Sequence, residues 1–164
     1  MAGRVQVERE GAIGWLVFDQ IERRNAITVE MWNAIPGAVS ELDGDDGIRV
    51  IVLRGAGDVA FVSGADISEF ERTRQGAGAA DYEASNARAY RAIADARKPV
   101  LAMIHGFCVG GGTAIAIHAD MRFAADDAQF GIPAARLGLG YSAAGIERLS
   151  RLVGPASAAE MLFS

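Results

Sequence analysis

The sequence is poor in the features that mark secreted, membrane-spanning or nucleic-acid-binding chains. Its 164 residues include one cysteine, Cys108, so an internal disulfide is impossible and a reducing compartment, the cytoplasm, is expected. The longest apolar runs, such as Val100–Ile104, are far shorter than the roughly 20 residues that cross a membrane. Residues 1–11 lack the apolar core of a signal peptide. With 21 acidic and 16 basic residues the net charge is −5, which disfavours nucleic acid as a partner.

The composition is that of an ordinary soluble domain, with 51% apolar and 23% charged residues. A chain of this length is expected to form one domain, over residues 1–164. Short apolar runs rich in β-forming residues predict strands, and helical spacing of apolar residues predicts helices. The predicted strands are 13–18, 48–54, 60–62, 100–104, 121–124 and 128–131, and the predicted helices are 29–42, 81–96, 113–118, 142–153 and 155–163. Strands that alternate with helices in this way indicate an α/β fold.

Some local signals refine this pattern. Thr28 is a predicted N-cap of the first helix, and Pro36 is expected to kink that helix. Residues 73–80 are rich in glycine, alanine and polar residues and are predicted to form a mobile surface segment.

A run of three glycines, Gly110–Gly112, follows a predicted strand and turn and opens a predicted helix. Glycines leave the backbone N–H groups accessible, and the first turn of a helix leaves those groups unpaired and partially positive. Such a turn suits an anion or a developing oxyanion. Tight packing of a helix on a strand is the alternative explanation for the same three glycines.

A second turn, Ser63–Asp66, has a similar character. A strand ends there, Gly64 allows a sharp bend, and Asp66 can cap a short helical turn over residues 67–70. An ordinary strand-to-helix turn would also explain this segment. The two turns are more informative together than either is alone.

Together, the segments around these turns resemble the enoyl-CoA hydratase/isomerase family, the crotonase superfamily. The resemblance is carried by Arg23–Ile27 (RRNAI), Ala60–Glu69 (AFVSGADISE), Lys98–Gly112 (KPVLAMIHGFCVGGG), Ala119–Ala124, Ala128–Gly131, Arg136–Gly138 and Glu147–Gly154. It implies a spiral of ββα units, shared with the Clp proteases, from which residues 1–164 lack the usual C-terminal helical region. It also implies homo-trimers or hexamers.

The resemblance further implies an acyl-CoA ligand and an oxyanion hole. The matching positions are Ala65 and Gly111, whose backbone N–H groups would bind the thioester oxygen. Arg24 matches the basic position near the CoA phosphates. Further predicted ligand contacts are Ala26, Ala65, Asp66, Ile67 and Gly110, whereas Arg23 is expected to be a solvated turn residue. Coenzyme A enters as part of the substrate, and no separate cofactor, metal or membrane partner is expected.

The sequence departs from the family's hydratases at both catalytic glutamates. The first position, two residues after Gly112, is Ala114, and the second, directly after Pro133, is Ala134. Alanine transfers no proton, and such groups each contribute about 10² to 10⁴-fold in rate. Weak hydratase activity is therefore expected, and decarboxylation, hydrolysis and isomerisation stay open.

Other polar side chains were weighed as replacements. Tyr141 is a candidate hydrogen-bonding group, with an aromatic wall of the acyl pocket as the favoured alternative. His118 and Cys108 are predicted to be core residues, and His105 is predicted to form a hydrogen bond in its turn. Arg136 is expected to form a structural or interface ion pair, and Glu147 is expected to be a surface or interface carboxylate. A metal site is not expected from the spacing of the histidines and Asp120.

Three functions remain open from the sequence. The first is an acyl-CoA enzyme with unusual acid–base groups, and the second is a non-catalytic acyl-CoA-binding protein. A serine hydrolase of the Clp-protease type is the third, but it needs a histidine beside Ser63 or Ser142 that the sequence does not place there. The final helix is expected to expose an apolar face at Met161, Leu162 and Phe163 unless another chain covers it.

Overall fold

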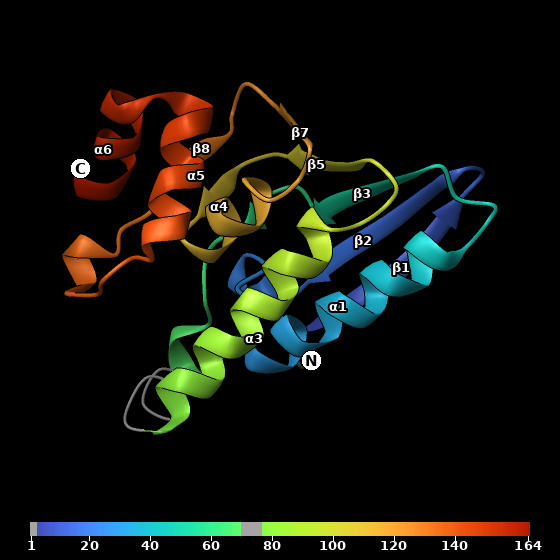
Figure 1. The fold of residues 1–164 in the computed structure, drawn as a ribbon, viewed down its shortest axis with the longest axis horizontal. Coiled ribbons are helices and arrows are strands. Elements are labelled where there is room, and N and C mark those ends of the chain that lie inside the picture. The colour runs from blue at the N-terminus through green and yellow to red at the C-terminus, as the bar shows by residue number, and fades with distance from the viewer. Residues whose placement is uncertain (1–2, 70–76) are drawn as a thin grey trace.

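The computed structural model describes residues 3–69 and 77–164 (Figure 1). Eight strands and five α-helices alternate along these residues, with three short 3-10 helices (η) between them. In chain order they are β1 (Arg4–Glu10), β2 (Ile13–Asp19), η1 (Ile21–Arg23), α1 (Val29–Gly44), β3 (Val50–Gly55), β4 (Ala60–Val62), η2 (Ile67–Glu69), α3 (Ala77–Ala94), β5 (Val100–Ile104), β6 (Phe107–Val109), α4 (Gly111–Ala116), β7 (Met121–Ala124), β8 (Gln129–Gly131), η3 (Ala135–Leu137), α5 (Ala143–Val153) and α6 (Pro155–Phe163).

The strands form two sheets in a repeating pattern. The five-stranded sheet has the order β1-β2-β3-β5-β7, and the three-stranded sheet has the order β4-β6-β8. In each of three successive units, the first strand joins the larger sheet, the second joins the smaller sheet, and a helix follows. The chain therefore advances by one strand in both sheets with every unit, which is a spiral of ββα turns.

The smaller sheet is entirely parallel, since β6 pairs in parallel with both β4 and β8. The carboxyl ends of its three strands consequently lie at the same edge. Residues 63–66 leave β4 there, residues 110–112 leave β6, and residues 132–134 leave β8. This arrangement brings segments together that are about 70 residues apart in the sequence.

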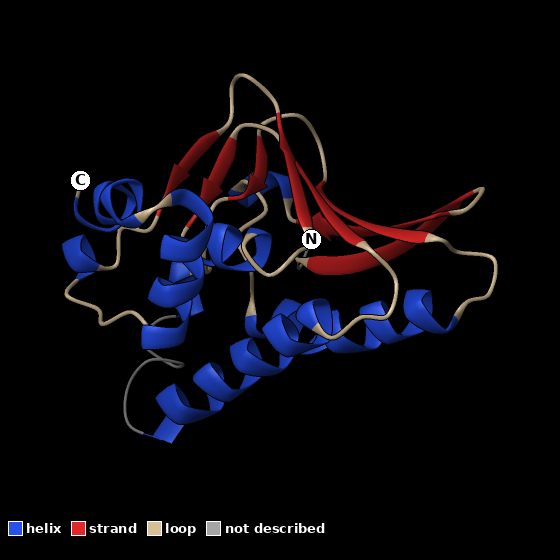
Figure 2. Cartoon of the chain, turned by 45° about the horizontal axis from the view of Figure 1, so that its top comes forward, coloured by secondary structure: helices blue, strands red, loops and turns tan. Residues whose placement is uncertain are grey.

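Helices α1 and α3 run along one side of the larger sheet, while α5 and α6 lie at the end of the molecule that carries the smaller sheet (Figure 2). The main core lies between the sheet and these two long helices, and Trp32, Ile35, Leu53 and Ile93 are fully or almost fully buried in it. A second apolar cluster joins α5 and α6 to the rest of the chain. Leu149 of α5 and Ala158 and Leu162 of α6 pack there with Ile117 and Ile132.

Most predicted elements are present, with boundaries within a few residues. Helix α1 begins after Thr28, whose hydroxyl accepts a hydrogen bond from the Met31 N–H at 3.2 Å, and Pro36 lies inside the helix. The α/β class is confirmed. Within the described residues, none of the helices is long and apolar enough to cross a bilayer.

Two strands were not predicted. Strand β1 alternates Val5 and Val7 with polar residues, but it is a sheet edge with a solvated outer face, so its apolar signal is weak. Strand β6 has three residues inside a segment that was predicted as a glycine-rich turn, because its pairing with β4 and β8 is not local.

Helix α3 begins at Ala77, not at residue 81, so the predicted mobile segment is wrong for residues 77–80. Alanine favours the helix and outweighs the single glycine in this stretch. The rest of that predicted segment, residues 73–76, lies outside the described residues.

The apolar face of the last helix is covered more than the sequence predicts. Leu162 is buried in the second cluster and Met161 is half-buried against it, whereas Phe163 is 74% exposed. The Met161 carbonyl also accepts a hydrogen bond from the Ile132 N–H at 2.7 Å, which ties α6 to the segment after β8.

Candidate functional site

The two glycine-containing turns, which the sequence places 45 residues apart, are in contact. A Cβ atom on Gly110 would lie 3.7 Å from the Gly64 Cα, and one on Gly64 would lie 3.5 Å from the Val109 carbonyl oxygen. Both distances are ordinary van der Waals contacts. The parallel pairing of β4 with β6 therefore places residues 63–66 directly beside residues 110–112.

The Ala65 N–H has a defined direction. Residues 27 and 65 form an isolated parallel bridge, in which the Ile27 N–H donates to the Gly64 carbonyl at 2.8 Å. Because the peptide unit is planar and trans, the N–H of the Gly64–Ala65 peptide points opposite to that carbonyl, away from Ile27. Within the described residues, this N–H has no hydrogen-bond partner.

The Gly111 N–H opens helix α4 and is similarly free. Gly110 is the N-cap, with φ +54°. The first N–H groups of any α-helix lack a partner within the helix. Across the part of the chain that is described, no other group accepts a hydrogen bond from Gly111 N–H. By contrast, the Gly110 N–H is occupied by the Gly131 carbonyl at 2.8 Å.

The glycine run also serves packing, as the alternative explanation proposes. A Cβ atom on Gly112 would lie 2.2 Å from the Val62 carbonyl oxygen, which is impossible without a shift of the backbone. Helix α4 thus packs tightly on β4 because residue 112 has no side chain. Tight packing therefore explains Gly112, whereas access of a ligand to the backbone N–H explains Gly111.

Thr113 holds this turn to the next strand, a role that the sequence reading missed. Its buried hydroxyl lies 2.6 Å from the Cys108 carbonyl and 3.1 Å from the Gly131 carbonyl. A threonine in the first turn of a helix that follows a strand is the only signal of this role in the sequence.

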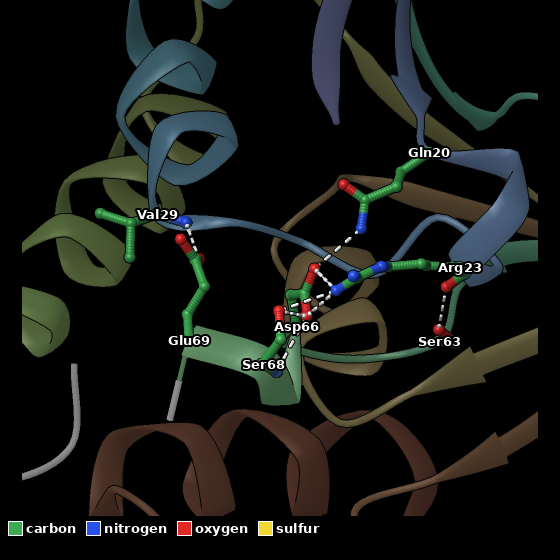
Figure 3. Close-up of polar contacts among 7 residues, drawn as sticks. All are labelled: Gln20, Arg23, Val29, Ser63, Asp66, Ser68 and Glu69. Carbon is green, nitrogen blue, oxygen red and sulfur yellow. Dashed lines mark hydrogen bonds and ion pairs between the residues drawn. The ribbon is translucent and has the colours of Figure 1, made fainter. Parts of the chain in front are cut away.

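Asp66 lies at the centre of a polar cluster that fixes the first turn (Figure 3). As predicted, it caps the following helical turn, because its Oδ1 accepts hydrogen bonds from the Ser68 N–H at 3.0 Å and from the Ser68 hydroxyl at 2.7 Å. Gln20 Nε2 donates to Oδ2 at 3.0 Å, and Arg23 Nη1 lies 2.8 Å from both carboxylate oxygens. Arg23 lies in a turn with a side chain that is more than half exposed, as predicted, but it also forms an ion pair with Asp66 that the sequence did not predict.

The Asp66 carboxylate is only 7% exposed, which would by itself raise its pKa. Hydrogen bonds from Ser68, Gln20 and Arg23 stabilise the charged form and more than offset this burial. The pKa of Asp66 is consequently lowered from its ordinary value, and the group is ionised at neutral pH.

The residues predicted to contact CoA differ in how exposed they are. Arg24 is exposed, has φ +51°, and places its guanidinium 4.9 Å from the centroid of the Phe107 ring. The side chain of Ile67 is 72% exposed, and that of Ala26 is buried. The Asp66 N–H donates to the Ile27 carbonyl at 2.9 Å, so this N–H is already occupied.

The unusual backbone at Arg24 is held by the residue after it. Asn25 is buried, also has a positive φ of +54°, and uses its side chain in three hydrogen bonds. Its Oδ1 accepts from the Gln20 N–H at 3.0 Å, and its Nδ2 donates to the carbonyls of Ala56 and Ala60 at 2.8 Å each.

Two cavities of about 300 Å³ each lie near α1, and neither is lined by Ala65 or Gly111. One borders the Asp66 cluster and carries an acidic lining with Glu22, Glu30 and Glu69. An acidic wall repels phosphate, so this cavity does not suit the CoA phosphates.

The two alanines that are predicted to occupy the glutamate positions of the hydratases are both at least half-buried. Ala114 is buried in α4, and Ala134 is half-buried against the second apolar cluster. Neither side chain can hold or transfer a proton.

The neighbouring histidine is hydrogen-bonded, as predicted, but it is half-buried and does not lie in the core. His118 Nδ1 lies 2.6 Å from the Ala114 carbonyl, and its ring stacks on Tyr90 with 4.6 Å between centroids and 6° between planes. Burial lowers the pKa of His118, and the charge of Arg148 adds to this effect.

Tyr141 packs against the second apolar cluster, beside Ala134 and Met161. Burial raises the pKa of its hydroxyl to about 12, so the group stays protonated at neutral pH. It is therefore able to donate a hydrogen bond but does not act as a base.

The remaining candidates are occupied elsewhere or lack the expected partner. Cys108 is fully buried, which raises the pKa of its thiol to about 12, as expected for a core residue. Glu147 forms an exposed ion pair with Arg151 at 2.6 Å. For His105, no partner of its buried Nε2 is found in the described region, and Arg136 likewise has no ion pair there, so neither predicted interaction is observed.

Among the described residues, neither Ser63 nor Ser142 is hydrogen-bonded to a histidine, as a serine hydrolase of the Clp-protease type would require. The Ser63 hydroxyl donates to the Arg23 carbonyl at 3.2 Å, and the Ser142 hydroxyl caps α5 by accepting from the Gly145 N–H at 3.1 Å. Over residues 3–69 and 77–164, no group of histidine, cysteine and carboxylate side chains is suited to a metal ion.

Comparison with known proteins gives a consistent result. A family model described as enoyl-CoA hydratase/isomerase matches residues 8–164. A crotonyl-CoA hydratase from Syntrophomonas wolfei is 34% identical over 158 residues, and a short-chain-enoyl-CoA hydratase from Clostridium acetobutylicum is 33% identical over 160 residues. These matches cover 96% and 98% of this chain but 60% and 61% of the relatives.

Solved structures show the same likeness. A crystal structure from Hyphomonas neptunium, described as a putative enoyl-CoA hydratase/isomerase family protein, aligns with a TM-score of 0.93 and 39% identity. The alignment covers 97% of this chain and 61% of that one. This likeness confirms the expected crotonase-like spiral of ββα units. The chain spans about 60% of the length of these relatives.

Proposed function

The chain belongs to the enoyl-CoA hydratase/isomerase family, and on that premise we propose that it binds an acyl-CoA thioester and polarises its carbonyl. The two donors are the backbone N–H groups of Ala65 and Gly111. Together they form an oxyanion hole that stabilises the enolate or oxyanion of the bound acyl group. In other enzymes, loss of one such donor costs on the order of 3 kcal/mol in the transition state.

One observation carries this proposal: two adjacent turns each present a backbone N–H without an acceptor among the described residues. Both residues are partly exposed, so an acceptor from a ligand can reach these two neighbouring N–H groups. A carbonyl oxygen has two lone pairs and accepts from both. The donors belong to the backbone, so they require no particular side chain at either position.

The CoA moiety is proposed to bind beside Arg24 and along residues 65–67. The guanidinium of Arg24 is exposed, and its position over Phe107 holds it at the surface, where a phosphate can reach it. Of this group, Ala26 and Asp66 contribute backbone atoms only, since Ala26 is buried and the Asp66 side chain is engaged in its cluster.

The reaction class follows from what surrounds the hole. Because Ala114 and Ala134 carry no acid–base group, efficient hydration is not the proposed activity. Decarboxylation needs the fewest further groups: the bond between the α-carbon and a carboxylate breaks, CO₂ leaves, and its electron pair forms the enolate that the two N–H groups stabilise. A proton from solvent then completes the product. Hydrolysis and isomerisation require an additional polar group, for which Tyr141 is the candidate.

A second candidate function is a non-catalytic acyl-CoA-binding or regulatory protein. It is favoured by the same two alanines, by the engagement of His118 with Ala114 and Tyr90, and by the burial of Cys108 in the core. In this case the two N–H donors for the carbonyl are retained, and the groups that transfer protons are not.

The assembly and location of the protein are part of the proposal. A homo-trimer or hexamer in the cytoplasm is proposed, by analogy with the family and in keeping with a single buried cysteine. Light scattering of the purified chain tests the assembly, and a monomer at all concentrations would contradict it.

The main test is a panel of CoA esters that includes crotonyl-CoA and malonyl-type esters, with binding and turnover measured for each. Turnover of at least one ester supports an enzyme. Tight binding of all esters without turnover supports the binding protein. Absence of binding to any ester contradicts both functions.

A further inference from the structure

The turn that carries Ala65 is attached to residues 20–29 on both sides of the proposed donor. Before Ala65, the Gly64 carbonyl accepts from the Ile27 N–H at 2.8 Å. After it, the Asp66 N–H donates to the Ile27 carbonyl at 2.9 Å, and Glu69 Oε2 accepts from the Val29 N–H at 2.8 Å. Figure 3 shows the side-chain contacts among these, with Glu69 reaching the first residue of α1.

The peptide that carries the donor is free to rotate unless it is held. Gly64 has φ +121°, a conformation that residues with a side chain rarely adopt, and glycine has the broadest choice of backbone angles. A hydrogen bond weakens steeply as its angle falls below about 120°. The strength of the hydrogen bond from the Ala65 N–H to a carbonyl therefore depends on what fixes the plane of the Gly64–Ala65 peptide.

The hydrogen bond from the Ile27 N–H to the Gly64 carbonyl already restrains this peptide, and the side-chain cluster around Asp66 adds a second restraint from the next residue. A buried carboxylate is costly, and removal from water is offset here by partners from two separate segments: Gln20 and Arg23 from the turn after β2, and Ser68 from η2. An exposed serine or aspartate would be sufficient to cap a helical turn of three residues. The additional partners fix the position of Asp66 relative to Ile27.

We propose that Gln20, Arg23 and Asp66 are positioning residues for the Ala65 N–H, and that their cluster sets how strongly a bound thioester carbonyl is polarised. This inference rests on the proposed role of Ala65 in an oxyanion hole. The side chains of the cluster do not touch the ligand and act through the backbone. Its disruption weakens the interaction with the carbonyl and leaves the binding of the CoA moiety unchanged.

Arg23 offers a way to test the cluster without disturbing the core. All three of its contacts are made by one nitrogen, Nη1, which lies 2.8 Å from each Asp66 oxygen and 2.7 Å from the Ser68 hydroxyl. The side chain is otherwise more than half exposed. An ammonium group has three donors on one nitrogen, so Arg23→Lys is expected to retain these contacts, whereas Arg23→Met removes them.

A matched control lies away from both turns. Asp43 accepts from Arg97 Nε at 3.1 Å and from the backbone N–H groups of Arg97 and Lys98 at 3.0 Å each. It is a half-buried carboxylate that, like Asp66, pairs with an arginine and accepts from the backbone, with two backbone donors where Asp66 has one, and it joins α1 to the segment before β5. Asp43→Asn therefore matches Asp66→Asn in chemistry.

The experiment compares Asp66→Asn, Arg23→Met, Arg23→Lys and Asp43→Asn with the unmodified chain. The ligands are crotonyl-CoA labelled with ¹³C at the thioester carbonyl and free CoA. Difference infrared spectroscopy measures the carbonyl stretching frequency of the bound ester, calorimetry measures both affinities, and thermal unfolding measures stability.

In the unmodified chain, the stretching frequency is expected to fall on binding. Asp66→Asn and Arg23→Met are expected to lose at least half of this shift and about tenfold in affinity for crotonyl-CoA, the size of one hydrogen bond. Their affinity for free CoA should change by no more than about twofold, because neither of the altered side chains is proposed to contact CoA. Arg23→Lys and Asp43→Asn are expected to retain the full shift.

The outcomes separate the inference from the proposed function. No shift in the unmodified chain would overturn the proposed function itself. A shift that is retained in both Asp66→Asn and Arg23→Met would overturn the inference and leave the oxyanion hole in place. An equal loss of affinity for crotonyl-CoA and free CoA, in proportion to lost stability, would assign the cluster to folding alone and also overturn the inference.

Discussion

Arg23 meets Asp66 through a single nitrogen, with Nη1 placed 2.8 Å from both carboxylate oxygens. The contact joins the turn after β2 to the turn after β4, two segments separated by 43 residues. Its carboxylate is buried, whereas the guanidinium is more than half exposed. The Asp66 carboxylate therefore has a fixed position, and Asp66 directly follows Ala65, which carries the proposed donor N–H.

The charge of Asp66 predicts a dependence of stability on pH. Because its hydrogen bonds lower the pKa in the folded state, the ionised form stabilises the fold at any pH above the unfolded value of about 3.9. This stabilisation is lost as the pH falls through the lower, folded value. The difference in unfolding free energy between the unmodified chain and Asp66→Asn should therefore be constant from pH 8 to about 5 and shrink below about pH 4.

Urea denaturation at each pH measures this difference. A difference that already declines between pH 8 and 6 would mean that another group, not Asp66, carries the charge dependence.

Gly112 is predicted to tolerate no side chain. A methyl group there would lie 2.2 Å from the Val62 carbonyl, so Gly112→Ala must displace α4 from β4. We expect a loss of about 2 kcal/mol or more in the free energy of unfolding, together with weaker binding of acyl-CoA.

Gly37 provides the matched control for this change. It lies within α1 with nothing within 4 Å of its Cβ position, so Gly37→Ala should stabilise the chain by about 0.5–1 kcal/mol. Destabilisation of similar size in both variants would contradict the packing argument.

Asn25 is predicted to be a stability determinant of the Arg24 turn. Asn25→Ala removes three hydrogen bonds, leaves the Gln20 N–H without a partner, and places alanine at a positive φ. We expect a cost of about 3 kcal/mol, which corresponds to a fall in melting temperature of roughly 10 °C for a chain of this size.

Asn33→Ala is the control, because Asn33 is exposed and its Oδ1 accepts one hydrogen bond, from Arg88 Nη2 at 3.0 Å. It should cost less than about 0.5 kcal/mol. Equal losses in the two variants would show that Asn25 does not lock the turn.

The proposal that Ala114 and Ala134 replace two acid–base groups can be tested by introducing glutamate at both positions. The double variant Ala114→Glu with Ala134→Glu is predicted to hydrate crotonyl-CoA at least about 10²-fold faster than the unmodified chain, since each group contributes about 10² to 10⁴-fold. The double variant with glutamine at both positions has similar size without proton transfer and should show no gain. Retained crotonyl-CoA binding without any hydration in the glutamate variant would contradict the proposed placement of the acyl group.

The sequence predicted the turns of the site better than their connections. The cap by Asp66 could be predicted because aspartate commonly caps a helical turn within three residues of itself. The contacts of Asp66 with Gln20 and Arg23 span more than 40 residues, and no local pattern specifies which turns meet. They follow only from the bridge between residues 27 and 65.

The fold shows the same limit. Strands 60–62 and 100–104 were predicted with the observed boundaries because each is a buried apolar run. Strand β6 was missed because it has three residues, with glycine shortly before and after, and exists through its pairing with β4 and β8. Yet it is this strand that places Gly111 beside Gly64.

The central claim is that Ala65 and Gly111 together bind a thioester carbonyl, and NMR of their amide groups tests it most directly. With ¹⁵N-labelled alanine and glycine, the two amide proton shifts are compared between the complexes with crotonyl-CoA and with free CoA. The account predicts that both protons move downfield when the ester replaces free CoA, because a hydrogen bond to the carbonyl then forms at each. Two shifts that are the same in both complexes, while the ester is bound, would contradict it.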